Sequence, residues 1–356
     1  MSGPLAGLRV IEIAGIGPGP FAAMMLADHG AEVIRVNRPN AVDQLTDPLL
    51  RSRKSVVLDL KSDDGRAKLK QLCKTCDALL EGFRPGVMER LGLGPDALLT
   101  ENPALVYGRM TGWGQDGPYA QLAGHDINYI SISGALASFG RAGEKPVPPI
   151  NLIGDFGGGG MLLAFGMVSA MLAVKNGAPG QVVDCAMTDG SALLMAMMWG
   201  YRARGEWNDE RGTNLLDTGA PFYEVYETSD GKFVSIGPIE PQFYAMLMAK
   251  LGLEGDPAFT DQNERSLWPQ QRRRFTGLFL TRTRAEWCEL LQATDSCFAP
   301  VLNLAECLGD PHNLARQTFV DVNGVIQPAP APRYSATPCD FPLPPRQPGA
   351  DQSIFD

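Results

Sequence analysis

Two short segments, thirty residues apart, carry ionisable side chains at positions that suit proton transfer. His125 and Asp126 lie in the first segment and Asp155 in the second, and in each the ionisable residues follow a glycine and precede apolar residues at helical spacing. A helix start offers free backbone N–H groups and the positive end of the helix dipole. A histidine and an aspartate there suit a site where an oxyanion forms between two proton-transfer groups. The sequence therefore predicts an acid–base pair.

Each of these residues also has an ordinary structural interpretation. A Gly-Asp pair before an apolar helix is a common N-cap, and a histidine next to an aspartate at a helix start is often a satisfied surface or core group. The chemical hypothesis holds only if His125 and Asp155 face each other across a pocket. The apolar spacing predicts helices over residues 127–139 and 161–174.

Composition and charge exclude several classes of partner. The 356 residues are 44% hydrophobic, and the net charge of −9 disfavours nucleic acid, which needs a cationic surface. An anionic small molecule would need a dedicated arginine cluster. The longest apolar run, residues 161–174, is shorter than the roughly 18 residues that cross a bilayer, and the N-terminus lacks the pattern of a signal sequence. We expect a cytoplasmic protein without membrane insertion.

The seven cysteines point to free thiols in a reducing compartment. Cys73 and Cys76 match a CxxC pattern, but no second pair at metal-site spacing accompanies them. We interpret them as buried or half-buried structural thiols and expect no metal site.

Short β-rich runs alternate with helical stretches along the first half of the chain. They lie at residues 8–13, 32–36, 55–60, 78–81 and 105–110. This alternation predicts βαβ units and a mostly parallel sheet, which is an α/β, Rossmann-like fold. The glycine-rich loop after the first strand is similar to a dinucleotide fingerprint. However, Pro18 and Pro20 remove N–H donors, and the second strand ends in Asn37-Arg38 without an acidic residue, so we exclude NAD.

A second module is expected near Tyr223, where a strand runs into Pro238-Ile239-Glu240 and several helical stretches follow. The predicted division is a large domain of residues 1–186 plus 330–356, a small α+β domain of residues 223–308, and linkers at 187–222 and 309–329. The tail beyond Pro328 is dense in proline and should run extended over another surface.

Six separated motifs, in order, give the chain a specific resemblance. They lie at residues 15–20, 83–87, 109–115, 124–129, 154–160 and 237–244. Together they resemble the class III CoA-transferase family (the CaiB/BaiF type), and within it the branch that racemises 2-methylacyl-CoA thioesters, over residues 4 to about 335. The resemblance implies a Rossmann-like large domain built from both chain ends, a small domain and a homodimer of two interlocked subunits. It implies no cofactor besides the CoA of the substrate.

The resemblance also implies residue roles. His125 and Asp155 match the proton-transfer pair, Glu240 the carboxylate that orients the histidine, and Asp126 a supporting acid beside it. The implied reaction interconverts (2R)- and (2S)-2-methylacyl-CoA through an enolate. A helix N-terminus favours neutral imidazole and a nearby Glu240 favours imidazolium, so the resting state of His125 is left open.

The family pattern also implies a binding site for CoA. Its members are Arg38, Leu58, Asp59, Leu60, Lys61, Gly82, Phe83, Arg84, Arg90, Gly124, His125, Asp126, Ile127, Asn128 and Tyr129. Guanidinium groups fit phosphate geometry in two-point contacts. Any one of these arginines taken alone is more simply a solvated side chain.

Methionines cluster at Met187, Met195, Met197 and Met198. Methionine at helical spacing usually fills a core, and the alternative is a pliable apolar track for acyl tails of different shapes.

Two rival functions are kept. In a CoA-transferase of the same family, an aspartate at the position of Asp155 acts as a nucleophile and forms a mixed anhydride. A catalytically silent CoA-binding protein is the other rival, although both His125 and Asp155 are intact here. The natural acyl chain is left open.

Overall fold

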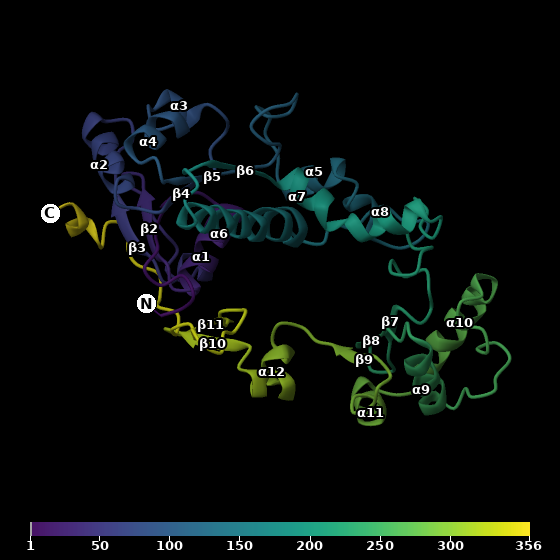
Figure 1. Cartoon of the computed structure of the whole chain (residues 1–356). Coiled ribbons are helices and arrows are strands. Elements are labelled where there is room, and N and C mark those ends of the chain that lie inside the picture. Colours follow the sequence, from purple (N-terminus) through teal and green to yellow (C-terminus); the bar gives the residue numbers. More distant parts are fainter. Residues whose placement is uncertain (1) are drawn as a thin grey trace. The chain divides into compact units, whose positions relative to one another are not determined.

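Six short runs of aliphatic and β-branched residues form a parallel sheet in the computed structural model, which describes residues 2–356 (Figure 1). The spatial order is β3-β2-β1-β4-β5-β6, and every neighbouring pair is parallel. This order reverses between β1 and β4, as in doubly wound sheets. The predicted α/β, Rossmann-like fold is confirmed. The strands are β1 (Arg9–Ile13), β2 (Glu32–Asn37), β3 (Lys54–Val57), β4 (Ala78–Glu81), β5 (Val106–Thr111) and β6 (Val182–Ala186).

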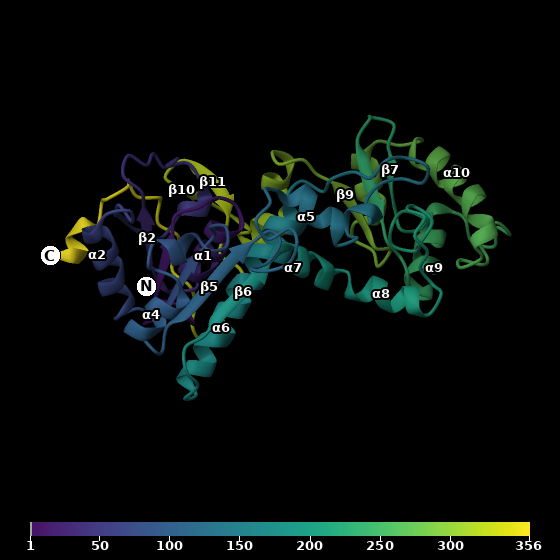
Figure 2. The ribbon, with the colours of Figure 1, turned by 90° about the horizontal axis from the view of Figure 1, so that it is seen from above.

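Helices cover both faces of the sheet, and successive strand residues point to opposite faces. Val10 packs in one core with α1 and α6, whereas Ile11 packs in the other with α2, α3 and α4. Figure 2 shows α6 running beside β5 and β6, which it contacts. The helices are α1 (Pro18–Asp28), α2 (Asp63–Cys73), α3 (Val87–Arg90), α4 (Pro95–Glu101) and α6 (Leu162–Lys175).

The helix expected at residues 161–174 begins nine residues earlier. A π-helix, η3 (Leu152–Met161), runs directly into α6. The joined helix Leu152–Lys175 has 24 residues and a mean hydropathy of 1.7, so by length and composition alone it could cross a membrane. The prediction that the longest apolar segment is shorter than the roughly 18 residues that cross a bilayer is therefore wrong. The helix packs against α1, β5 and β6, and 44% of its most apolar part is buried, whereas Phe165 and Leu172 are exposed.

The glycines of residues 157–160 allow close helix packing. Gly158 of η3 lies against Gly190 of α7 (Met187–Leu194), where a methyl group on Gly190 would lie 1.8 Å from the Gly158 carbonyl oxygen. Gly160 lies against α1, where a methyl group would lie 2.7 Å from the Phe21 ring. The run of glycines therefore lets η3 approach α1 and α7.

The helix predicted over residues 127–139 is shorter than expected. α5 (Asp126–Ile132) ends just before Gly134, whose φ of +87° lies in the left-handed region that interrupts a helix. A separate 3₁₀ turn, η2 (Leu136–Ser138), follows.

The chain divides into two units, which are described separately. The first contains residues up to Ala135, Pro149–Ala196 and Arg316–Asp356, and the second contains Leu136–Pro148 and Met197–Ala315. This division differs from the predicted boundaries. Residues 187–196 belong to the first unit because α7 packs on η3, and residues 316–329 belong to it because they include a hairpin tied to Arg51.

The second unit is built on a three-stranded antiparallel sheet in the order β7-β8-β9. Its core is aromatic: the rings of Phe275 and Phe279 pack on Tyr226, and Trp287 packs on Phe279. Its elements are α8 (Ala196–Ala203), which starts at the boundary, β7 (Glu224–Glu227), β8 (Phe233–Ile236), α9 (Pro241–Leu251), η4 (Arg265–Leu267), α10 (Trp268–Phe279), α11 (Arg284–Leu291), β9 (Phe298–Val301), η5 (Glu306–Gly309) and α12 (Pro311–Arg316).

The returning tail completes the first unit. Its hairpin, β10 (Phe319–Val322) and β11 (Val325–Pro328), receives hydrogen bonds from the buried Arg51, which also pairs with Asp28. A proline-rich stretch without helix or strand follows as predicted, up to η6 (Gln352–Phe355). Figure 1 shows this last segment beside β3, where the Asp351 carboxylate accepts from the Ser55 N–H at 2.8 Å.

Candidate active site

The site lies where the strand order reverses. The loops after β1 and β4 both leave the carboxyl edge of the parallel sheet, where ligands bind in doubly wound folds. Two cavities, of about 720 and 520 Å³, open at these loops. Both are lined by Ile13, Gly15, Ile16 and Phe83. The two cavities are therefore neighbours along one edge of the sheet.

His125 and Asp155 both line the larger cavity. His125 is the residue before α5, with extended backbone, and its N–H donates to the Asn128 side-chain oxygen at 3.0 Å. Asp155 lies in the first turn of η3. The sequence thus predicted that both residues lie near helix starts, although the second helix begins earlier than expected, and the structure places the two side chains in the lining of one cavity.

The surroundings of Asp155 raise its pKa. Burial of this half-buried carboxyl is the main cause, and the charge of Asp126 adds to it. A hydrogen bond from the Asn151 amide to Asp155 Oδ2, at 3.0 Å, and the charge of His125 act in the opposite direction. Sequence reasoning missed Asn151, because an asparagine before an apolar run has no distinctive pattern. A carboxyl with a raised pKa is better suited to exchanging protons near neutrality.

Asp126 connects the two segments. It is buried, and its Oδ2 accepts the N–H of Asp155 at 2.7 Å, which ties the start of α5 to the first turn of η3. A methyl group on Gly154 would lie 2.6 Å from that oxygen, so the glycine before Asp155 makes room for the contact. Asp126 therefore lines neither cavity and joins the segment of His125 to that of Asp155, and its predicted role as a supporting acid stays a prediction.

Tyr129 forms another wall of the larger cavity. Its ring packs edge-on against Trp113, with centroids 4.7 Å apart, and its hydroxyl donates to the Gly124 carbonyl. Gly112 and Gly124 both lie too close to this ring to carry a side chain. The motifs at residues 109–115 and 124–129 thus pack together in one wall of the cavity.

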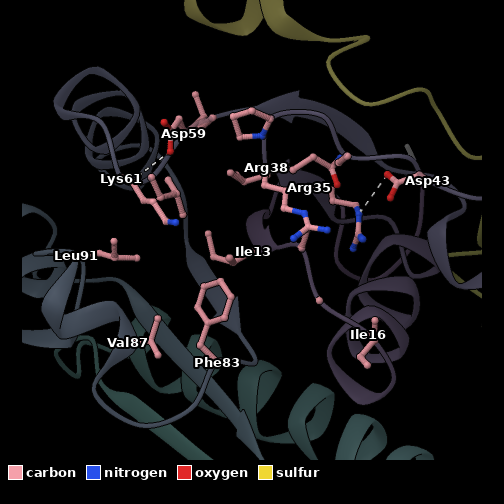
Figure 3. Close-up of a pocket in the computed structure, with 18 of the residues that line it drawn as sticks. Ile13, Ile16, Arg35, Arg38, Asp43, Asp59, Lys61, Phe83, Val87 and Leu91 are labelled. Atoms are coloured by element: carbon pink, nitrogen blue, oxygen red, sulfur yellow. Dashed lines mark hydrogen bonds and ion pairs between the residues drawn. The ribbon is translucent and has the colours of Figure 1, made fainter.

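The smaller cavity contains six of the fifteen residues predicted to hold CoA. Figure 3 shows Arg38 and Lys61 on opposite sides of it, with Phe83 below. The Asp59 carboxylate accepts the Lys61 N–H at 3.0 Å and shapes this turn. Of the predicted residues, Arg38, Leu58, Asp59, Leu60, Lys61 and Phe83 line the smaller cavity, and Gly82, Phe83, Arg84, Gly124, His125 and Tyr129 line the larger one.

Four predicted residues of the first unit line neither cavity. Asp126 is buried, Ile127 and Asn128 are exposed on α5, and Arg90 is exposed on α3 beside Gly86. Glu240 belongs to the second unit, where it is the exposed N-cap residue of α9. Its predicted role beside His125 stays a prediction.

Arg35 is a cationic residue of the smaller cavity that sequence reasoning missed (Figure 3). It is buried and pairs with Glu12 at 2.5 Å and with Asp43 at 3.6 Å. Glu12, which has no solvent exposure, also pairs with Arg53. The sequence signal that could have identified Arg35 is a charged residue within a strand.

The cysteine and methionine interpretations can be examined in the same unit. Cys73 and Cys76 are free and buried, and burial raises their pKa values to about 12 and 11, so the thiols are unreactive structural groups. Residues 2–356 contain no group of three or more His, Cys, Asp or Glu residues placed to hold a metal ion. Of the methionines, Met167, Met171 and Met187 are all buried in one core, and Met187 also lines the larger cavity.

Comparison with known proteins identifies the family. The family model for CoA-transferase family III matches residues 5–352. The chain belongs to CoA-transferase family III. Within this family it is 46% identical to the alpha-methylacyl-CoA racemase of Mus musculus and 45% identical to that of Homo sapiens, each over 94% of this chain and 87% of the relative.

Two more distant members of the family show how far the similarity extends beyond the racemases. The succinyl-CoA–D-citramalate CoA-transferase of Chloroflexus aurantiacus is 32% identical over 94% of this chain and 89% of its own length. The crystal structure of Rv3272 from Mycobacterium tuberculosis matches with a TM-score of 0.84 at 26% identity, covering 100% of this chain and 99% of the other. The chain is therefore a homologue of alpha-methylacyl-CoA racemase in a family that also contains transferases.

Proposed function

We propose that this protein is a racemase that interconverts (2R)- and (2S)-2-methylacyl-CoA thioesters by proton transfer through an enolate. The single observation that carries the proposal is that His125 and Asp155, from different helix starts, line one cavity. The 46% identity to a racemase over 94% of the chain supports the same reaction.

Each feature of the cavity has a role in this chemistry. The α-proton of a thioester is far less acidic than any side chain, so its removal requires a positioned base and donors for the enolate oxygen. Racemisation needs one proton-transfer group on each face of the carbon, and His125 and Asp155 exchange roles for the opposite enantiomer.

The neighbouring cavity supplies a site for the CoA moiety. Arg38 and Lys61 offer cations to its phosphates, while Phe83 lines both cavities and marks the passage from the nucleotide to the thioester. Met187, in the larger cavity, offers a soft surface to an acyl chain.

We further propose that the active protein is a homodimer, with the small domain near Glu240 of one subunit contributing to the site of the other. Large apolar side chains exposed on α6, α7 and α8, among them Phe165, Leu193 and Trp199, support an interface. Size-exclusion chromatography with light scattering at micromolar concentration tests this, and a stable, fully active monomer would contradict it. A cytoplasmic location, also proposed, can be checked by cell fractionation.

Exchange with solvent tests the reaction. Either enantiomer of a 2-methylacyl-CoA, incubated with the protein in D₂O without an acceptor acid, should gain deuterium at the α-carbon. His125→Ala and Asp155→Ala should each lower the rate by about 10²–10⁴-fold, the usual loss for a general acid or base. His312→Ala, which removes an exposed histidine that lines neither cavity, is the matched control and should keep full activity.

The same experiment separates the racemase from a transferase. A transferase would show no α-deuterium, would move CoA to an added carboxylate, and would leave an acyl group on Asp155 that hydroxylamine traps. That outcome would replace the racemase assignment with the nucleophilic one.

A further inference from the structure

Arg109, at the carboxyl end of β5, is a cation next to the cavities whose guanidinium is already engaged. It is buried, and its Nε lies 3.2 Å from Glu81 Oε1. Its two terminal nitrogens donate to the two carboxylate oxygens of Glu89, at 2.7 and 3.3 Å. A two-point contact of this kind fixes the orientation of both groups. Arg109 therefore holds protein segments together instead of offering a free charge to a ligand.

Glu81 connects this network to the loop after β4. It is the last residue of the strand, 1% exposed, and its Oε2 accepts the N–H of Phe83 at 2.6 Å. Burial raises the pKa of Glu81 to about 7, while Arg109 and the Phe83 N–H act in the opposite direction. This carboxylate therefore sets the direction in which the chain leaves the strand, and with it the position of Gly82, Phe83 and Arg84.

Glu89 connects the same network to α3. This helix has only four residues, which is too short to be stable through its own hydrogen bonds. The burial of Met88 and the contact from Arg109 to Glu89 both hold this helix against the sheet. Val87, one turn before Arg90, and Leu91 line the smaller cavity. The position of α3 thus determines the shape of that cavity.

We infer that Glu81, Arg109 and Glu89 form a clamp that positions the 82–84 loop and α3 to receive CoA, so that CoA affinity depends on residues that do not touch it. The inference rests on the proposed function, because it takes the two cavities to be the CoA site. Binding to preordered segments is tighter because less ordering entropy is lost on association. The clamp should therefore affect CoA binding much more than proton transfer.

Two variants test the clamp. Glu89→Gln removes one charge at a side chain that is 44% exposed, and Arg109→Lys keeps the charge but loses the two-point geometry. Glu101→Gln is the matched control, since Glu101, at the end of α4, makes an ion pair with Lys74 at 3.2 Å and loses one charge in the same way. Calorimetric titration with free CoA gives the dissociation constant, solvent exchange gives kcat and KM, and thermal melts report the folded fraction.

We expect the Kd for CoA to rise about 5- to 20-fold in Arg109→Lys and about 3- to 10-fold in Glu89→Gln, with KM following and kcat within about twofold, while Glu101→Gln keeps the Kd of the parent. If Arg109→Lys fails to fold, Glu89→Gln carries the test alone. An unchanged Kd in folded variants of a parent that binds CoA would overturn the clamp alone. A parent that does not bind CoA would overturn the proposed function and the clamp together.

Discussion

The packing of η3 on α7 predicts that Gly190 cannot accept even one methyl group. In Gly190→Ala the new carbon would lie 1.8 Å from the Gly158 carbonyl oxygen and 2.5 Å from its carbon. An ordinary contact needs about 3.4 Å or more, so the two helices must separate by about 1.5 Å, which weakens contacts along the whole interface. Both partners are backbone atoms, so no side-chain rotation relieves the overlap.

The expected loss of folding stability in Gly190→Ala is the difference between two opposing effects. Overpacking of this kind costs about 3 kcal/mol or more, and the better helix propensity of alanine returns about 1 kcal/mol. The net loss of about 2–4 kcal/mol should lower the melting temperature by about 5–10 °C. Because Asp155 lies on η3, racemase activity should fall as well.

Gly277→Ala is the matched control for this experiment. Gly277 is also inside a helix, α10, and a methyl group there would meet nothing within 4 Å. This variant should melt at or slightly above the temperature of the parent in circular dichroism. Equal melting of the Gly190→Ala variant and the parent would show that the close approach of η3 and α7 is not needed.

Two further predictions concern the site. Arg38→Ala should weaken CoA binding by about 1.5 kcal/mol, or about 10-fold, in calorimetric titration. This is the low end for a charge-assisted contact, because Arg38 is exposed. Arg90→Ala should have a smaller effect, since Arg90 lines neither cavity. Burial raises the pKa of Asp155 above its usual 3.8, so the folded protein binds this proton more tightly than the unfolded chain and loses stability as the pH rises through that interval. Asp155→Asn should therefore melt above the parent at pH 7, with a difference that shrinks towards pH 4; a difference that grows on acidification would refute the raised pKa.

Much of the first unit could be predicted from sequence because buried parallel strands are aliphatic on both faces. The strand expected at 78–81 matches β4, and those near 8–13 and 32–36 agree within one residue at each end. The strand expected at 55–60 ends at Val57 instead, since the side chain of Asp59 accepts the N–H of Lys61 and turns the chain. β6 was not predicted, and it joins the sheet at the edge as the parallel partner of β5.

The candidate pair was predictable, but its surroundings were not. A glycine, an ionisable residue and an apolar helix form a local pattern, so His125 and Asp155 could be selected from sequence. The contact from Asn151 to Asp155 depends on the π-helical turn, which glycine content alone does not indicate. For Arg109, sequence cannot distinguish a free cation from an engaged one, because its partners Glu81 and Glu89 precede it by 28 and 20 residues.

The tail that covers β3 has a consequence for biosynthesis. Ser55 and Val57 have partners in the tail 294 to 296 residues later, so this edge of the sheet stays open while the rest of the chain is made. At about 5–20 residues per second, the delay is about 15–60 s. An open strand edge is a template for pairing with other chains. A nascent chain of this protein therefore passes through an aggregation-prone interval that lasts until residues 349–352 leave the ribosome, and termination before these residues would make that interval permanent.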